Sequence, residues 1–192
     1  MDIRNLLFKY RSYTPIPLGL MIIYFARPGN AYLILGIPLL LMGETIRIWA
    51  VSYAGGQTRT RRVGAPALCS SGPFAFVRNP LYLGNTLMYA GIVLIAGSAN
   101  VWLMVATTFL FFLIQYSLII SLEEETLTLL FGEEYEEYKN NVPGIFPRIS
   151  PWETRDDREP SNLLKTLKTE KRTLQNVVLI LILIFLRIQV FS

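Results

Sequence analysis

Residues 78–85 of the chain read Arg78-Asn79-Pro80-Leu81-Tyr82-Leu83-Gly84-Asn85, and they open an apolar run that continues to about Ala96. Charged and amide side chains at the mouth of a membrane span are costly unless they have a partner or a purpose. A later apolar run ends in Glu123-Glu124-Glu125. A polar entrance to one helix and carboxylates at the exit of the next predict one site, at one membrane face, for a charged organic molecule.

The composition is that of a membrane protein. Of the 192 residues, 52% are hydrophobic and only 17% are charged, and the apolar residues come in blocks. A soluble domain would usually be about one quarter charged, and unbroken apolar blocks indicate membrane-spanning helices. The sequence therefore predicts an all-α fold, a polytopic helical membrane protein with four to five transmembrane helices and a pocket facing the cytoplasm.

Four spans are expected, at about residues 15–26, 31–53, 81–96 and 100–122. The first is short, because a dozen residues reach about 18 Å against a hydrocarbon thickness of about 30 Å. It must recruit preceding residues or lie in a thinned or protein-lined region. The connections between the first two spans and between the last two are turn-like, which predicts two antiparallel hairpins.

The rest of the chain divides at prolines. Residues 123–140 are expected to form an amphipathic helix, and the prolines at 143, 147 and 151 end regular helix. We predict a core over residues 1–147, an exposed linker over 148–162 and a basic, membrane-associated or spanning helix over 163–192. The apolar run Val177–Leu186 in that last segment is either a fifth span, with Arg187 snorkelling, or part of an interfacial helix.

Basic residues indicate the orientation. They precede the first span and lie between the second and third, at Arg4, Lys9, Arg11, Arg59, Arg61, Arg62 and Arg78. By the positive-inside rule the N-terminus, the loop 54–79 and the segment after Leu122 are cytoplasmic, in an inner or plasma membrane. Both halves of the predicted site then face the cytoplasm.

Two residue types restrict the chemistry. The chain has no histidine, which excludes histidine-based triads, histidine-ligated zinc and a non-haem iron facial triad. Its single cysteine, Cys69, allows neither an intrachain disulfide nor a multi-cysteine metal site. We expect no metal site and no nucleic-acid partner, and any catalysis must rely on Glu, Asp, Tyr, Arg, Asn and positioning.

Several polar residues are candidates for the site. On a helix, Arg78, Tyr82 and Asn85 line one stripe. An interfacial anchor has the same spacing, but Asn85 lies a turn deeper and favours a site. Glu123 and Glu124 lie where a span ends, and a carboxylate there can hold an ammonium group or a pair of ribose hydroxyls.

Glu44 and Arg47 lie one helical turn apart inside the second span. Ionisable groups at this depth normally face a partner or a cavity. They are either a structural ion pair or part of a site. Gly84 and Gly91 on the third span permit close approach of a helix or a ligand.

An ordered series of motifs resembles a known family. The series is Gly72-Pro73-Phe74-Ala75-Phe76-Val77-Arg78-Asn79-Pro80-Leu81-Tyr82-Leu83-Gly84-Asn85, then Glu123-Glu124-Glu125, then Phe131-Gly132-x-Glu134-Tyr135-x-x-Tyr138 and Val142-Pro143. It resembles the isoprenylcysteine carboxyl methyltransferase and phospholipid N-methyltransferase group of integral membrane enzymes. The similarity covers about residues 72–148 and is specific for the superfamily but not for a substrate.

The resemblance implies S-adenosylmethionine as cofactor, in a cytoplasmic cofactor pocket. The implied cofactor-binding residues are Arg78, Asn79, Pro80, Tyr82, Gly84, Asn85, Glu123 and Glu124. The cofactor methyl would point into the bilayer, so the expected partners are membrane lipids and a hydrophobic methyl acceptor. Glu44, Arg47 and Glu124 are the candidate catalytic residues, with Glu44 or Glu124 as base where the acceptor must lose a proton.

Two positions depart from the family pattern. The family typically has Arg-His-Pro where this chain has Arg78-Asn79-Pro80, and often an arginine where it has Gly144, with Arg148 nearby but not equivalent. These departures keep open a non-catalytic membrane scaffold with a degenerate site. A membrane reductase related to the sterol reductases is a second alternative, because those enzymes share part of this membrane architecture. A prenylated cysteine, an aminophospholipid, a small thiol and a quinone- or terpenoid-like alcohol all remain admissible acceptors, and the oligomeric state is not specified.

Overall fold

The computed structural model describes residues 2–27, 30–56, 60 and 63–191. Helices dominate these residues, and no strand occurs among them, which confirms the all-helical expectation. The α-helices are α1 (Ile3–Tyr10), α2 (Ile16–Tyr24), α3 (Asn30–Ala54), α4 (Pro80–Ala96), α5 (Val101–Phe131), α6 (Glu133–Asn141) and α7 (Leu163–Phe191), and a 3-10 helix η2 covers Gly72–Ala75.

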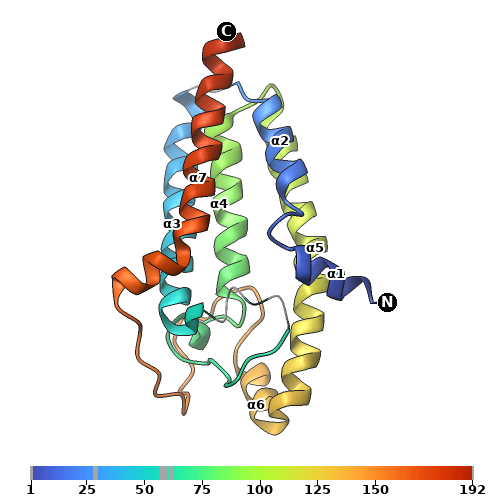
Figure 1. The fold of residues 1–192 in the computed structure, drawn as a ribbon, viewed down its shortest axis with the longest axis vertical. Coiled ribbons are helices and arrows are strands. Elements are labelled where there is room, and N and C mark those ends of the chain that lie inside the picture. The colour runs from blue at the N-terminus through green and yellow to red at the C-terminus, as the bar shows by residue number, and fades with distance from the viewer. Residues whose placement is uncertain (1, 28–29, 57–59, 61–62, 192) are drawn as a thin grey trace.

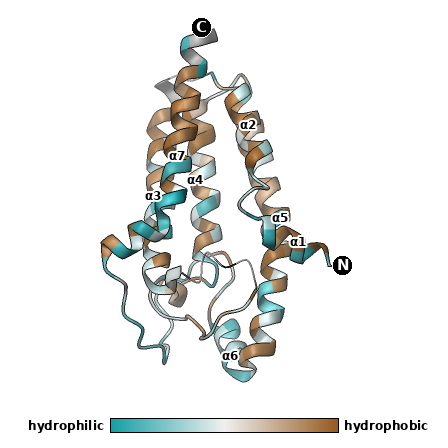
Figure 2. Ribbon diagram, in the orientation of Figure 1, coloured by the Kyte–Doolittle hydropathy of each residue, from teal (hydrophilic) through white to brown (hydrophobic). Residues whose placement is uncertain are grey.

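The long helices form a bundle whose two ends differ in polarity. α3, α4 and α7 stand on one side and α2 and α5 on the other, while α6 and the loops gather at one end (Figure 1). The helices are predominantly hydrophobic over most of their length, and the loop end is hydrophilic (Figure 2). Large apolar side chains face outward from α3, α5 and α7, among them Ile34, Leu41, Leu103, Leu113, Ile182 and Phe185. An apolar belt above a polar end is the surface expected of a protein that sits in a bilayer.

Among the described residues, two helices, Tyr32–Ala54 and Val101–Phe131, are long and apolar enough to cross a membrane, and Pro80–Ala96 is a shorter apolar helix. The first expected span, at about residues 15–26, corresponds to the shorter helix α2, whose 9 residues reach about 14 Å. α1 does not lengthen it, because the chain turns between the two helices and α1 lies across α5 (Figure 1). The count of four to five spans therefore stays a prediction.

The most extensive helix interface joins α3 to α4, and glycines make it possible. A Cβ on Gly43 would lie 2.6 Å from the carbonyl oxygen of Gly84, and a Cβ on Gly91 would lie 2.7 Å from that of Gly36. On each helix the two glycines are seven residues apart and so share a face. Because no side chain separates the helices there, their backbones touch, as in other membrane-type helix pairs.

The predicted hairpin of the first two spans is wrong in its packing. α2 packs against α7 and α4, not along α3. The physical reason lies in the connection, because the backbone N–H of Arg27 donates to the carbonyl oxygens of Ala96 at 2.9 Å and Gly97 at 3.3 Å. This holds the chain over the end of α4 before α3 begins. The second predicted hairpin is confirmed, since α4 and α5 pack together.

The expected amphipathic helix over residues 123–140 is divided. Its first part continues α5 as one helix of 31 residues, and its second part is α6. The break falls at Gly132, whose φ of 53° and ψ of −124° are accessible essentially only to glycine. Helix then stops at Asn141 and does not resume until Leu163, as the prolines predict.

The segment after α6 runs back along the residues that lead into α4. Trp152 donates its backbone N–H to the carbonyl oxygen of Ala75 at 2.9 Å, and Arg148 donates likewise to Phe76 at 2.9 Å. The ring of Trp152 lies 5.7 Å from that of Tyr138, beside a small core of Tyr135, Tyr138 and Val142. This packing brings the end of α6 to the start of α4.

Candidate functional site

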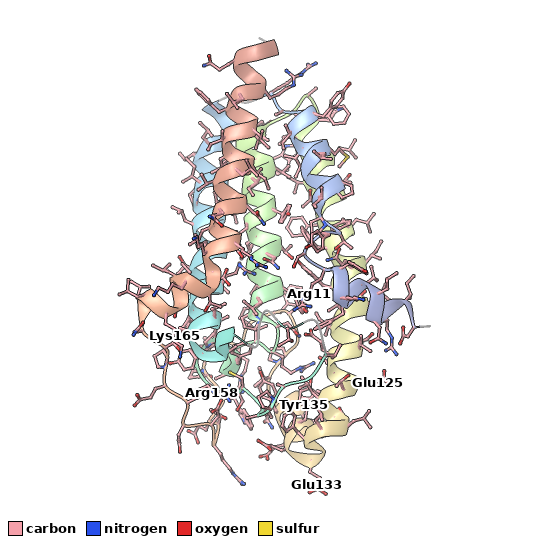
Figure 3. The ribbon with its side chains drawn as sticks, viewed as in Figure 1. Arg11, Glu125, Glu133, Tyr135, Arg158 and Lys165 are labelled. Carbon is pink, nitrogen blue, oxygen red and sulfur yellow. The ribbon has the colours of Figure 1, made fainter. Side chains whose placement is uncertain are left out.

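The start of α4 and the end of α5 meet at the polar end of the bundle. Pro80 occupies the first turn of α4, where its missing N–H costs nothing, so Arg78 and Asn79 stand at the lip of the helix. Arg78 Nη2 lies 2.6 Å from Glu124 Oε1, and its Nε donates to the same oxygen at 3.2 Å. The two predicted halves of the site are thus brought together. In the view of Figure 3, Glu125 lies on α5, with Arg11 above it and Tyr135 of α6 below it.

Arg78 also ties α6 to this junction. Its Nη1 donates to the carbonyl oxygen of Lys139 at 2.9 Å and to that of Val142. Its backbone N–H donates to the carbonyl oxygen of Pro143 at 2.9 Å. Four of the five side-chain N–H groups are therefore engaged, and the Arg78 side chain is only 12% exposed. Arg78 fixes the relative positions of α4, α5 and α6.

The second carboxylate of the site pairs with a tyrosine. The Tyr82 hydroxyl donates to Glu123 Oε2 at 2.8 Å. The Tyr82 ring lies 4.5 Å from that of Tyr116, which stacks on Phe112 at 5.0 Å, and Tyr89 meets Phe112 edge-on at 4.9 Å. An aromatic column thus runs from Glu123 between α4 and α5, and it gives the site an apolar inner wall.

Asn85 lies on the surface of α4 between α3 and α5, and its side chain hydrogen-bonds the Tyr116 hydroxyl on α5. Arg47 on α3 donates from Nη1 to Asn85 Oδ1 at 2.6 Å. The predicted stripe therefore borders two helices: Arg78 and Tyr82 contact α5, and Asn85 contacts Arg47 of α3 as well as Tyr116 of α5. Within the described residues the ion-pair partner of Arg47 is Glu170 of α7, at 2.7 Å, and not its neighbour on the same helix, Glu44.

The remaining predicted residues fall in different places. Gly84 lies against α3, where its Cβ would be 2.7 Å from the Gly43 carbonyl oxygen, so its close neighbour is a helix. Asn79 donates from Nδ2 to the carbonyl oxygen of Gly144 at 3.0 Å. Glu44 is half-buried on α3, one turn before Arg47. Roles for Gly84 and Glu44 in binding or catalysis stay predictions.

Sequence reasoning missed Lys139 and Glu170. Lys139 Nζ lies 3.7 Å from Glu124 Oε2, opposite the oxygen that Arg78 holds. Glu170 is fully buried against Arg47. A signal existed for Glu170, because it is the one acidic residue between Leu163 and Phe191, among basic and apolar neighbours.

A groove leads from solvent to Glu124. It has a volume of about 490 Å³ and lies along the outer faces of α5 and α6, and it is lined by Ser121, Glu124, Glu125, Thr128, Leu129, Glu136 and Lys139. Glu124 is thereby reached from outside the bundle although its side chain is only 18% exposed. The carboxylate can meet a cationic or hydroxylated ligand without the helices moving apart.

Neighbouring groups stay neutral. Burial raises the pKa of the Tyr135 hydroxyl beside Arg78, so this phenol remains protonated at neutral pH. Burial also raises the pKa of the Cys69 thiol to about 11, which removes it as a nucleophile. The other ionisable groups of the site are Arg78, Glu123, Glu124 and Lys139.

The chemistry of these groups matches that of S-adenosylmethionine, which carries an ammonium, a carboxylate and a ribose diol. Carboxylates at Glu123 and Glu124 accept hydrogen bonds, and a guanidinium and two side-chain amides donate them. The Nε of Arg47 is buried and has no hydrogen-bond partner among the described residues, so a donor close to Asn85 is left for a polar ligand or water. The residues present fit such a cofactor.

Comparison with known proteins gives one family. The family model described as phospholipid methyltransferase matches residues 31–134, which is more than half of the chain. This region contains α3, α4 and α5 and hence Arg47, Arg78 and Glu124. No solved structure matches the chain.

Three relatives are similar to the chain over part of their length. The cobalt-zinc-cadmium resistance protein CzcN of Cupriavidus metallidurans is 32% identical over 116 residues, 60% of this chain and 48% of the relative. The nickel-cobalt-cadmium resistance protein NccN of Alcaligenes xylosoxydans xylosoxydans is 29% identical over 120 residues, 62% and 52% of the two chains. The protein-S-isoprenylcysteine O-methyltransferase of Schizosaccharomyces pombe is 28% identical over 127 residues, 62% and 51%. The chain spans about half the length of the curated relatives it matches.

Proposed function

Because this chain belongs to the phospholipid methyltransferase family, we propose that it transfers a methyl group from S-adenosylmethionine to a lipophilic acceptor at the cytoplasmic face of a membrane. One observation carries the proposal. The Arg78–Glu124 pair, at 2.6 Å, joins the start of α4 to the end of α5 where the apolar bundle meets its polar end. A charged cofactor and a lipophilic acceptor can meet only at such a boundary.

The cofactor would be held by groups from both helices. Glu123 and Glu124 would accept hydrogen bonds from its ammonium group and ribose hydroxyls, and Asn79 and Asn85 would contribute amides. Glu124 Oε1 is already held by Arg78, so Oε2, whose charged neighbour among the described residues is Lys139 at 3.7 Å, is the oxygen we assign to the ligand. When bound, the cofactor supplies a methyl group activated by a sulfonium.

The residues of the chain act mainly by positioning. Arg78 holds the Glu124 carboxylate and the end of α6 in one arrangement, and Tyr82 holds Glu123. The aromatic column that starts at Tyr82 and Tyr116 excludes water from the inner side of the site. Orientation in a dry site can supply much of the rate enhancement of a bimolecular displacement, about 7–11 kcal/mol in favourable cases. This chemistry suits a chain without histidine, provided that the acceptor is already a carboxylate, a thiolate or a free amine.

Charge supports the cytoplasmic orientation. The loop between α3 and α4 carries Arg59, Arg61 and Arg62, and its end, Arg78, lies at the site. By the positive-inside rule this loop faces the cytoplasm, and so does the site.

The acceptor would reach the site sideways through the lipid. One relative is named as an enzyme that methylates a prenylated cysteine, and two others are named for metal resistance. The apolar outer faces of α3 and α5 support an acceptor that partitions into the bilayer. A lipid, a prenylated thiol or carboxylate and a terpenoid-like alcohol all meet this condition.

The test is methyl transfer itself. The full chain in nanodiscs is incubated with S-adenosylmethionine labelled in its methyl group and with total membrane lipid extract, and label in the organic phase is measured. We expect transfer by the wild-type chain, none by Glu124→Gln, and unchanged transfer by Glu137→Gln, an exposed glutamate on α6. Equal labelling with and without the protein would contradict the proposal and favour a non-catalytic scaffold.

A further inference from the structure

The C-terminal helix α7 lies beyond the residues that the family model matches, yet it reaches a residue of the predicted site. Its contact is made by Glu170, which is 0% exposed. A buried carboxylate is strongly unfavourable without a charged partner. The partner is Arg47, whose Nη2 lies 2.7 Å from Glu170 Oε2 and donates to the Thr173 hydroxyl at 3.3 Å.

Arg47, held by Glu170, in turn fixes the orientation of the Asn85 side chain. The other terminal nitrogen, Nη1, donates to Asn85 Oδ1 at 2.6 Å. A guanidinium can only donate, so it fixes which end of the amide faces it. The Asn85 Oδ1 is turned toward Arg47, and the amide hydrogen-bonds the Tyr116 hydroxyl of α5 on its other side.

Packing leaves Arg47 little freedom to depart from this position. Its side chain is 8% exposed, and its Cγ lies against Gly84, where an added Cβ would be only 2.6 Å away. The stem is therefore pressed against the backbone of α4 beside Asn85. With Glu170 at one end and Gly84 along the stem, the guanidinium is held from two elements.

On the basis of the proposed function, we infer that Glu170 is a positioning residue of the cofactor site. It holds Arg47, and Arg47 fixes the orientation of the Asn85 amide, which we assign to the methyl donor. α7 is then a part of the site and not only a membrane anchor. A purely structural account, in which the ion pair merely attaches α7 to the bundle, makes different predictions.

Affinity for S-adenosylhomocysteine, measured by calorimetry on the full chain in nanodiscs, tests the inference. Glu170→Gln keeps the shape but weakens the hold on Arg47, so we expect binding about tenfold weaker, the order of one lost hydrogen bond. Lys168→Gln, at an exposed position of the same helix, is the matched control and should bind as the wild type does.

A double-mutant cycle identifies the route of the effect. If Glu170 acts through Asn85, then Glu170→Gln should cause no further loss of affinity in an Asn85→Ala background. The variant Arg47→Met/Glu170→Met removes both charges together, which is compatible with a stable fold. We expect its melting temperature to stay near that of the wild type while its affinity falls.

The outcomes are separable. Wild-type affinity in Glu170→Gln, or full additivity with Asn85→Ala, would overturn the positioning role and leave the proposed function standing. An unchanged affinity in the double methionine variant would do the same. A wild-type chain that is folded but binds no S-adenosylhomocysteine would overturn the proposed function, and this inference with it.

Discussion

The side-chain amide of Asn79 donates to the carbonyl oxygen of Gly144 at 3.0 Å, so the two positions at which the chain departs from the family pattern are in contact. A Cβ at Gly144 would lie 3.4 Å from Arg78 Nη2. Position 144 therefore borders the guanidinium that holds Glu124. The two departures therefore form one contact, in which the Asn79 side-chain amide and the Gly144 backbone meet at the N-terminal end of α4.

Removing the Asn79 side-chain amide should destabilise the contact between the start of α4 and Gly144. We expect Asn79→Ala to lower the free energy of unfolding by about 1 kcal/mol, because it leaves the Gly144 carbonyl without this hydrogen bond. Thermal unfolding in detergent would measure it. Asn140→Ala, at an exposed position on α6, should leave the melting temperature unchanged. Equal melting temperatures for the two variants would mean that the Asn79–Gly144 hydrogen bond does not stabilise the fold.

Arg78 should not be replaceable by lysine. Its guanidinium reaches Glu124 and the carbonyl oxygens of Lys139 and Val142 together, and a single ammonium group cannot reproduce this planar fork. We expect Arg78→Lys to destabilise the fold by about 2 kcal/mol and to weaken S-adenosylhomocysteine binding. Arg155→Lys, at an exposed position of the linker, is the control. Wild-type stability and affinity in Arg78→Lys would show that charge alone is sufficient at this position.

The glycine contact between α3 and α4 should tolerate no side chain. A Cβ at Gly84 would lie 2.7 Å from the Gly43 carbonyl oxygen and 2.6 Å from Arg47 Cγ, so the helices must separate and Arg47 must shift. Gly84→Ala should therefore cost about 1–3 kcal/mol of stability. Gly19→Ala on α2 has nothing within 4 Å of the added carbon and serves as control. A Gly84→Ala variant as stable as Gly19→Ala would contradict this interface.

The docking of the segment after α6 should depend on acid. Partial burial opposes ionisation of Asp156, but hydrogen bonds from Ser70 and Ser71, with Arg158 nearby, hold the pKa of its carboxyl below the ordinary 3.8. Because the folded pKa is depressed, the stabilisation is complete well above pH 4 and is lost as the pH falls through the folded pKa.

Fluorescence of Trp152, which packs on Tyr138, would report this undocking in a chain with Trp49→Phe and Trp102→Phe. The wild-type signal should change on acidification below about pH 4. Asp156→Asn should remove this transition, because the amide does not titrate. A transition of equal size in that variant would assign the effect to other carboxyl groups.

Local patterns in the sequence predict most of the fold and the main contact of the site. Apolar blocks give α3, α4 and α5 to within a few residues, except that α5 continues through the glutamates to Gly132. Arg78 and Glu124 were expected to meet because one begins a span and the other ends the next span on the same side. That expectation needs only the direction of two neighbouring helices.

The long-range contacts could not be predicted in the same way. Glu170 meets Arg47 across 123 positions of sequence, and no local pattern says against which helix α7 packs. The same holds for α2, which follows the anchoring of Arg27 on α4 and not its nearness to α3 in sequence. Packing of non-adjacent segments decides both, and it also brings Arg47 of α3 to Asn85.

The most direct test of the central claim is calorimetric titration of the full chain in nanodiscs with S-adenosylhomocysteine, and with NADPH as the comparison ligand. We predict saturable binding of S-adenosylhomocysteine that is weakened in Glu124→Gln and Asn85→Ala, and no response to NADPH. No heat from S-adenosylhomocysteine in a folded chain would contradict a methyl-donor site. Saturable binding of NADPH alone would point instead to a reductase.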